Sequence, residues 1–289
     1  MGTSNPFKGG NNRNPLIPDW VGEDGGEPAG PDGQGGDDGN PDAGPRPDLG
    51  NPEADVPAPN RFQSGRTNFF RFAKTGGGGG DARRSMRRAV GSFVSKASGG
   101  ARQASKRMAS ERHATAELGR ILSSAAGVGI QEAVRRLNLG QLAGLPVPDI
   151  YAALVDIICQ PGGELDESYA REAYIQALAQ ITATQADLER PSKETIASFL
   201  AAFIANAIKN RLLNAVGNKI VTLPPDVAAV QNVEQQINDY VRGSVDDAIA
   251  EAGPDFPIDQ IVETIDDIYE RSLSLLDGEN DDEDGEEAA

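Results

Sequence analysis

PSKETIASFLAAFIANAIKNRLLNAVG, residues 191–217, is the stretch of sequence that decides the fold. After Pro191, apolar residues recur at the spacing of an α-helix, but there are too many of them for one narrow stripe. We therefore predict a helix that is buried on most of its sides and ends at Gly217. Its apolar positions are Ile196, Phe199, Leu200, Phe203, Ile204, Ala207, Ile208, Leu212 and Val216.

Helical spacing continues on both sides of this segment, and no segment shows the two-residue alternation of a half-buried strand. Gly127 and Gly129 interrupt the pattern, and Pro148 can open a helix at its first position. We expect an all-α bundle of about six to seven helices over residues 104–276. The other apolar stripes lie in Ala114–Ala125, Ile130–Leu137, Tyr151–Ile158, Ala170–Ile181, Val230–Ile249 and Ile258–Leu276.

The rest of the chain is too polar to build a core. The 289 residues include 34 Gly and 19 Pro, most of them before Ala104, where burial cannot repay the entropy of ordering. We expect residues 1–20 to be an N-terminal peptide with an apolar anchor. Residues 21–103 would be a disordered Gly/Pro/Asp linker and then a basic Arg/Phe segment with a five-glycine hinge, and residues 277–289 a disordered acidic tail.

Charge is segregated along the chain, although the formal net charge is −17. Residues 1–60 are acidic, residues 61–120 are strongly basic, and the remainder is acidic again and ends in an almost unbroken acidic run. Blocks of like charge are typical of solvated tails and of arms that interact with partners.

Residues that could form a catalytic or metal site are sparse. The only His is His113, in a polar helix start, and the only Cys is Cys159, on an apolar helix face. We expect a solvated His113 and a buried, inert Cys159, because the common zinc patterns need clustered ligands and a reactive thiol needs an activating neighbour. No glycine motif completes a phosphate-binding fingerprint. The sequence thus predicts no metal, no cofactor and no enzymatic activity.

Cysteine usage and hydropathy also bear on location. A lone Cys excludes an internal disulfide and suits a reducing cytoplasm. No signal peptide is visible at the N-terminus. The longest apolar run, Ile196–Ile208, is too short to span a bilayer and contains Asn206. We expect a cytoplasmic protein without a membrane anchor.

The basic segment 61–107 interleaves cations with aromatic rings, a combination that can bind phosphates and stack on bases. This supports an alternative function as a nucleic-acid-binding adaptor. The same segment could instead offset the acidic linker and tail, or dock on a partner protein. The candidate nucleic-acid contacts are Arg61, Arg66, Phe69, Phe70, Arg71, Arg83, Arg84, Arg87 and Arg88.

The first twenty residues offer a different kind of site. Removal of Met1 would leave Gly2 with an unhindered α-amine, whose pKa of about 7.7–8.0 leaves a share of it neutral and nucleophilic at cellular pH. Further on, an apolar cluster in a polar arm indicates a short peptide anchor that docks on a partner or on the chain's own bundle. Its residues are Pro15, Leu16, Ile17, Pro18 and Trp20.

Three features together resemble one family. They are the N-terminus MGTS…NPLIPDW, the acidic Gly/Pro arm, and the segment Leu145–Leu178, LPVPDIYAALVDIICQPGGELDESYAREAYIQAL. These are similar to the QatB family, the accessory B components of bacterial Qat anti-phage defence systems. The resemblance covers both ends of the arm and the body from about Leu118 onward, and none of its motifs is a catalytic signature.

This resemblance implies partners from one four-gene operon: an ATPase, a QueC-like enzyme and a TatD-like nuclease. QueC-type enzymes adenylate the carboxylate of 7-carboxy-7-deazaguanine and let an amine attack it. If that amine were the one on Gly2, the product would carry a deazaguanine amide at its N-terminus. The anchor at Pro15–Trp20 would raise the effective concentration of the terminus at the enzyme. The oligomeric state stays open.

Overall fold

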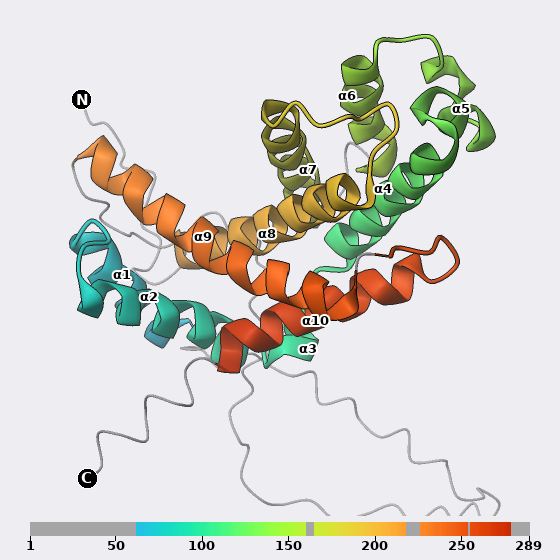
Figure 1. Ribbon diagram of the computed structural model, residues 1–289. Coiled ribbons are helices and arrows are strands. Elements are labelled where there is room, and N and C mark those ends of the chain that lie inside the picture. The colour runs from blue at the N-terminus through green and yellow to red at the C-terminus, as the bar shows by residue number, and fades with distance from the viewer. Residues whose placement is uncertain (1–61, 160–164, 218–225, 254, 279–289) are drawn as a thin grey trace, which may run out of the picture. The chain divides into compact units, whose positions relative to one another are not determined.

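The computed structural model describes residues 62–159, 165–217, 226–253 and 255–278, and these residues are almost entirely helical (Figure 1). No strand occurs among them, so the all-α prediction is confirmed for this part of the chain. The α-helices are α1 (Gln63–Lys74), α2 (Gly80–Ser92), α3 (Ala101–Arg107), α4 (Ala109–Val128), α5 (Ile130–Arg136), α6 (Val147–Ile158), α7 (Leu165–Ala183), α8 (Lys193–Gly217), α9 (Val227–Ala252) and α10 (Ile261–Gly278), with the π-helix η2 (Phe93–Ala97) and the 3₁₀ turn η3 (Gly140–Leu142).

Helix α8 is buried as the sequence predicts. Every residue from Phe199 to Asn210 is buried, and α4, α7 and α9 pack around it. Tyr174 of α7 lies edge-on to Phe203 of α8, with 5.9 Å between ring centroids, a favourable aromatic geometry. By length and composition alone α8 could cross a membrane, but this is weak evidence, because 72% of its apolar window is buried inside the protein.

Helix α10 runs along α4 toward its start and extends beyond it: Ile261, at the start of α10, lies against Gly119 in the middle of α4. Arg112 of α4 pairs with Asp266 at 2.6 Å, and the Thr115 and Tyr269 hydroxyls are 3.1 Å apart. Because Tyr269 lies opposite the first turns of α4, the rest of α10 continues past α4 and packs on α3 and α2. Figure 1 shows the red C-terminal end of α10 beside these two helices.

The expected start of order at Ala104 is wrong. Helices α1 and α2 precede Ala104 in the sequence and contribute to the same core. They can do so because their apolar residues recur at helical spacing between the arginines. Short helices of this kind gain most of their stability from packing, which the composition of the segment does not reveal. Their buried apolar side chains are Phe69, Phe72, Ala73, Ala82, Met86, Ala89 and Val90, joined by Val94 of η2.

The five-glycine segment is a docked turn between α1 and α2 and not an open hinge. Gly76, Gly77 and Gly79 adopt positive φ, which favours glycine. Two side chains of α9 hold the turn: Asn232 Nδ2 donates to the Gly76 carbonyl at 2.6 Å, and Gln236 Nε2 donates to the Gly77 carbonyl at 3.0 Å.

Helix boundaries downstream follow the predicted signals closely. Gly129, at φ +85°, separates α4 from α5, and Pro148 lies in the first turn of α6. The last helix departs from expectation, since α10 begins at Ile261 and residues 258–260 before it form a turn. Among the described residues, seven α-helices, α4–α10, begin at Ala109 or later, in line with the predicted number, and α1–α3 add to them.

Candidate functional site

The basic segment places its charges on the surface and its apolar residues in the core. The Arg71, Arg83, Arg84 and Arg87 side chains are exposed, whereas Arg88 and Arg66 are partly buried. The Arg66 guanidinium lies over the Phe62 ring, 5.3 Å from its centroid. On α2, residues 83, 84 and 87 project within about 100° of one another and so share one side of the helix.

Phe69 is wrong as a base-stacking candidate. It is only 5% exposed and packs edge-on against Phe72, with 6.2 Å between ring centroids. Phe70, the next residue, is 41% exposed and remains accessible. Helical geometry separates the two rings, because adjacent side chains point about 100° apart.

The N-terminal candidates lie outside the described residues. They are Gly2, the anchor Pro15–Trp20, and Arg61, so their predicted roles stay predictions. The linker and the tail beyond Gly278 also lie outside, as do residues 160–164 within the resembling segment.

A buried ion pair that the sequence did not predict joins α4 to α8. Glu111 is fully buried and accepts two hydrogen bonds from Arg211, from Nε at 2.5 Å and from Nη2 at 3.0 Å. The Arg211 guanidinium also lies over the Tyr169 ring of α7, 5.5 Å from its centroid. Arg211 also lines a cavity of about 200 Å³, together with Phe62, Phe93 and Tyr169.

His113 and Cys159, widely separated in the sequence, line one cavity of about 260 Å³ together with Ser110 and Glu167. His113 is exposed and Cys159 is 2% exposed, as predicted for each. Burial raises the pKa of the Cys159 thiol to about 12, so the thiol is protonated at neutral pH. A nucleophilic cysteine needs a depressed pKa, so this arrangement does not activate the thiol.

A polar site interrupts the apolar surface of α8. Lys209 is 7% exposed and donates from Nζ to Asn206 Oδ1 at 3.0 Å. Burial lowers its pKa, and the nearby carboxylates of Glu234 and Glu172 oppose this shift. Lys209 lines a hollow of about 270 Å³ whose other residues are Gln180, Gln231, Glu234, Gln235 and Asn238.

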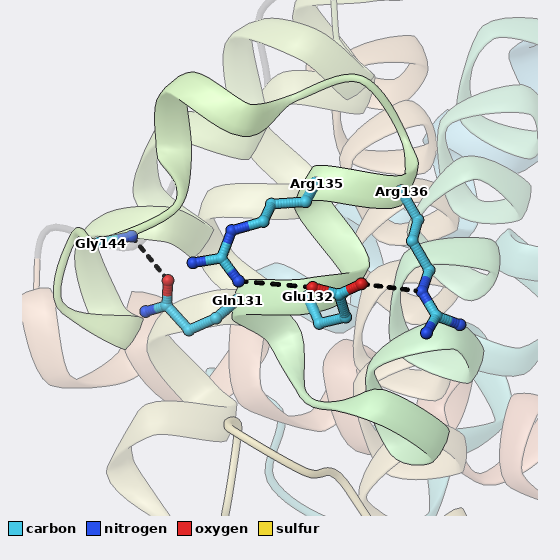
Figure 2. Close-up of polar contacts among 5 residues, drawn as sticks. All are labelled: Gln131, Glu132, Arg135, Arg136 and Gly144. Carbon is cyan, nitrogen blue, oxygen red and sulfur yellow. Dashed lines mark hydrogen bonds and ion pairs between the residues drawn. The ribbon is translucent and has the colours of Figure 1, made fainter.

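We call helix α5 and the turns after it, residues 130–145, the α5 lobe, and Figure 2 shows polar contacts within it. Glu132 accepts hydrogen bonds from Arg136 at 3.1 Å and from Arg135 at 3.4 Å. The side-chain amide of Gln131 makes two hydrogen bonds to the chain after η3. Its Oε1 accepts from the Gly144 N–H at 2.7 Å (Figure 2). Its Nε2 donates to the Leu145 carbonyl at 2.9 Å.

This lobe exposes apolar surface. The Leu137 and Leu145 side chains are 39% and 38% exposed, although the backbone around them is hydrogen-bonded in place. Ordered apolar side chains that face solvent are suited to contact with a protein partner. Within the described residues, no group of three or more His, Cys, Asp or Glu side chains is placed to hold a metal ion.

A comparison with protein-family models matches residues 99–276 to the Qat anti-phage system associated protein QatB. The chain belongs to the QatB family. The match begins two residues after η2 and ends in the last turn of α10, and so contains α3–α9 entirely. It makes this chain a component of an anti-phage defence system. Searches of curated proteins and of solved structures gave no match.

The QatB match includes each polar feature described above except the cations of α1 and α2. Glu111, Arg211, Lys209, His113 and Cys159 all lie inside it. Sequence reasoning considered His113 and Cys159 separately and did not consider Glu111, Arg211 or Lys209 as site residues. One signal was present: Asn206, Lys209, Asn210 and Arg211 are polar residues within the most apolar helix. Such residues need partners when they are buried.

Proposed function

We propose that this chain is a non-enzymatic component of a Qat defence complex, with the bundle as scaffold and the N-terminal arm as substrate. The observation that carries the proposal is the family match, because it assigns the helical body to the QatB family. The arm precedes that body and joins it through α1. Partners would be the operon's QueC-like enzyme, its ATPase and its TatD-like nuclease, acting together in the cytoplasm.

The proposed chemistry joins the Gly2 α-amine to a deazaguanine carboxylate. The QueC-like partner activates the carboxylate with ATP as an acyl adenylate and releases pyrophosphate. The neutral amine then attacks the acyl carbon, AMP leaves, and the nitrogen loses a proton as the amide forms. Thr3 and Ser4 are small and keep the approach uncrowded. The Pro15–Trp20 anchor holds the terminus close to the partner, which raises its effective concentration.

The scaffold part of the proposal is supported by ordered apolar side chains on the surface. Besides Leu137 and Leu145 of the α5 lobe, Ile175 of α7 is 51% exposed. Ile258, in the turn before α10, and Val262, in the first turn of α10, are 51% and 45% exposed. These positions belong to different elements, which fits a protein that contacts more than one partner.

Intact-mass analysis of the protein tests the modification. The chain is purified from cells that express the whole operon, and from cells that lack only the QueC-like gene. We expect the mass of one acyl deazaguanine in the first sample and none in the second. In a Gly2→Glu variant Met1 is retained and the added mass is lost, whereas a Thr3→Ala control keeps it. A terminus that has lost only Met1, in cells where defence is active, contradicts the proposal.

A nucleic-acid-binding adaptor remains the second candidate, and the exposed guanidinium groups on α2 favour it. Arg83, Arg84 and Arg87 face solvent on one side of the helix and can contact successive phosphates. Binding that weakens steeply with salt and falls when these three residues are changed to serine would support this candidate. Binding that persists in the triple variant would exclude a role for α2.

A further inference from the structure

The N-terminal helices carry charge of almost one sign. From Gln63 to Arg107 the only acidic residue is Asp81, and it pairs with Arg84 at 3.0 Å. We define the basic surface as the exposed cations of α2, η2 and α3 other than Arg107, whose Nη1 donates to the Ala97 carbonyl. They are Arg83, Arg84, Arg87, Lys96, Arg102 and Lys106. Cations on adjoining segments of the chain repel one another and together attract an anionic segment.

Helix α10 ends next to this surface. Ile261, at the start of α10, lies against Gly119 in the middle of α4. Later residues of α10 lie against the start of α4, since Asp266 pairs with Arg112, so the last turns of α10 pass beyond α4. Those turns pack on α2, η2 and α3, and Leu273 and Leu276 are buried. Figure 1 shows the end of α10 beside α2 and α3. The chain therefore leaves α10 at Gly278 beside the basic helices.

The residues after Gly278 have the complementary composition. The sequence Glu279–Ala289, ENDDEDGEEAA, contains seven carboxylates and no cation. Extended, it reaches about 35 Å, whereas the 13 residues of α2 span about 20 Å. The tail is thus long enough to follow either α2 or α3 from the point where α10 ends.

We propose that the acidic tail, Glu279–Glu287, binds the basic surface of α2 and α3 in the same molecule. The tail is tethered at Gly278, so its local concentration at the surface exceeds that of a free anion. It acts as a built-in competitor: any polyanionic partner must displace it before reaching Arg83, Arg84 and Arg87. The acidic linker before α1 carries a lower density of carboxylates and includes Arg46, which makes it the weaker competitor.

Zero-length carbodiimide crosslinking of the full chain tests the contact. The reagent joins carboxylates to amines, so the tail can link to Lys96 and Lys106 but not to arginine. We expect links from Glu279–Glu287 to these two lysines at low salt and their loss at high salt, where charges are screened. Mixing isotope-labelled and unlabelled chains identifies links within one molecule. Links only between molecules, links from the linker instead of the tail, or no links would each overturn the proposal.

Binding of heparin, a polyanion probe, gives a second readout. The comparison uses the full chain, a chain that ends at Gly278, and a full-length chain with the seven tail carboxylates changed to amides. Both tail variants should bind heparin about tenfold more tightly at low salt, since several exposed ion pairs of modest strength are removed. A chain with the tail acids reordered keeps the charge and should match the full chain. Equal heparin affinity in all four chains would overturn the proposal.

Discussion

Glu111 and Arg211 lie 100 residues apart and form a two-point ion pair, in which the glutamate is completely buried and the arginine side chain is 15% exposed. The contact ties the start of α4 to the end of α8. A carboxylate at this depth is costly to bury, and losing the two hydrogen bonds from Arg211 would remove a large part of what compensates its charge.

An Arg211→Met variant should therefore lose about 3–5 kcal/mol of unfolding free energy. Urea denaturation followed by circular dichroism measures this loss. A Glu111→Leu/Arg211→Met double variant should recover most of it, since both charges are then absent.

The matched control for this experiment is Arg271→Met. Arg271 makes the same two-point contact with Glu251, at 2.6 and 2.8 Å, but both residues are exposed. Exposed pairs contribute little because water screens them, so the control should unfold close to the parent. Equal losses in the two arginine variants would show that burial of Glu111 does not determine the effect.

Gly77→Ala should weaken the attachment of α1 and α2. Gly77 has φ +78°, and an added Cβ would lie 2.3 Å from Gln236 Nε2. The left-handed conformation alone costs an alanine about 1–2 kcal/mol, and displacing Gln236 breaks its hydrogen bond to the turn. Thermal unfolding measures the change.

Gly78→Ala is the control for that variant. Its φ is not positive, and the nearest atom to an added Cβ is the Thr75 carbonyl oxygen at 3.5 Å, an ordinary contact. We expect a change within about 0.5 kcal/mol. If Gly77→Ala were as stable as Gly78→Ala, the turn would not be docked on α9 as described.

Phe69→Ala and Phe70→Ala distinguish core from surface in α1. Loss of the buried Phe69 ring should cost about 3–5 kcal/mol, whereas loss of the exposed Phe70 ring should cost less than about 1 kcal/mol. Denaturant unfolding of the two variants gives the comparison. If nucleic acid binds α1, only Phe70→Ala should lower its affinity without unfolding the helix.

Cys159 should resist alkylation at pH 8 until the protein unfolds. Burial raises the thiol pKa from its ordinary 9.0 to about 12, so almost no thiolate is present. Iodoacetamide labelling followed by mass spectrometry measures the rate, and labelling in denaturant gives the reference. A His113→Ala variant should behave identically. Native-state labelling as fast as in denaturant would show that the thiol is accessible and activated.

The same shift predicts how stability depends on pH. The folded pKa lies above the unfolded one, so the protonated thiol contributes stability that is fully present below about pH 9. This contribution is lost as pH rises from 9.0 through about 12. In a Cys159→Ala variant, the unfolding free energy should fall less over this alkaline range, because the thiol is absent. Equal alkaline profiles for the variant and the parent would show that Cys159 does not contribute.

The amino-acid sequence alone determined the fold class and much of the helical plan. The density of apolar residues in Ile196–Val216 forces a buried helix wherever the other helices lie, and glycine at 129 and proline at 148 act on the local backbone. Both effects act within one helix or at one helix end, so the order of residues along the chain is enough to predict them.

Only the tertiary structure decided which other segments join the core and which side chains meet. Helices α1 and α2 are too short and too charged to be stable alone, and they fold because Phe69, Phe72 and Met86 reach a shared core. The Glu111–Arg211 pair and the shared cavity of His113 and Cys159 join residues from distant helices. Such contacts depend on how helices pack, and helical periodicity carries no information about the partner that each face meets.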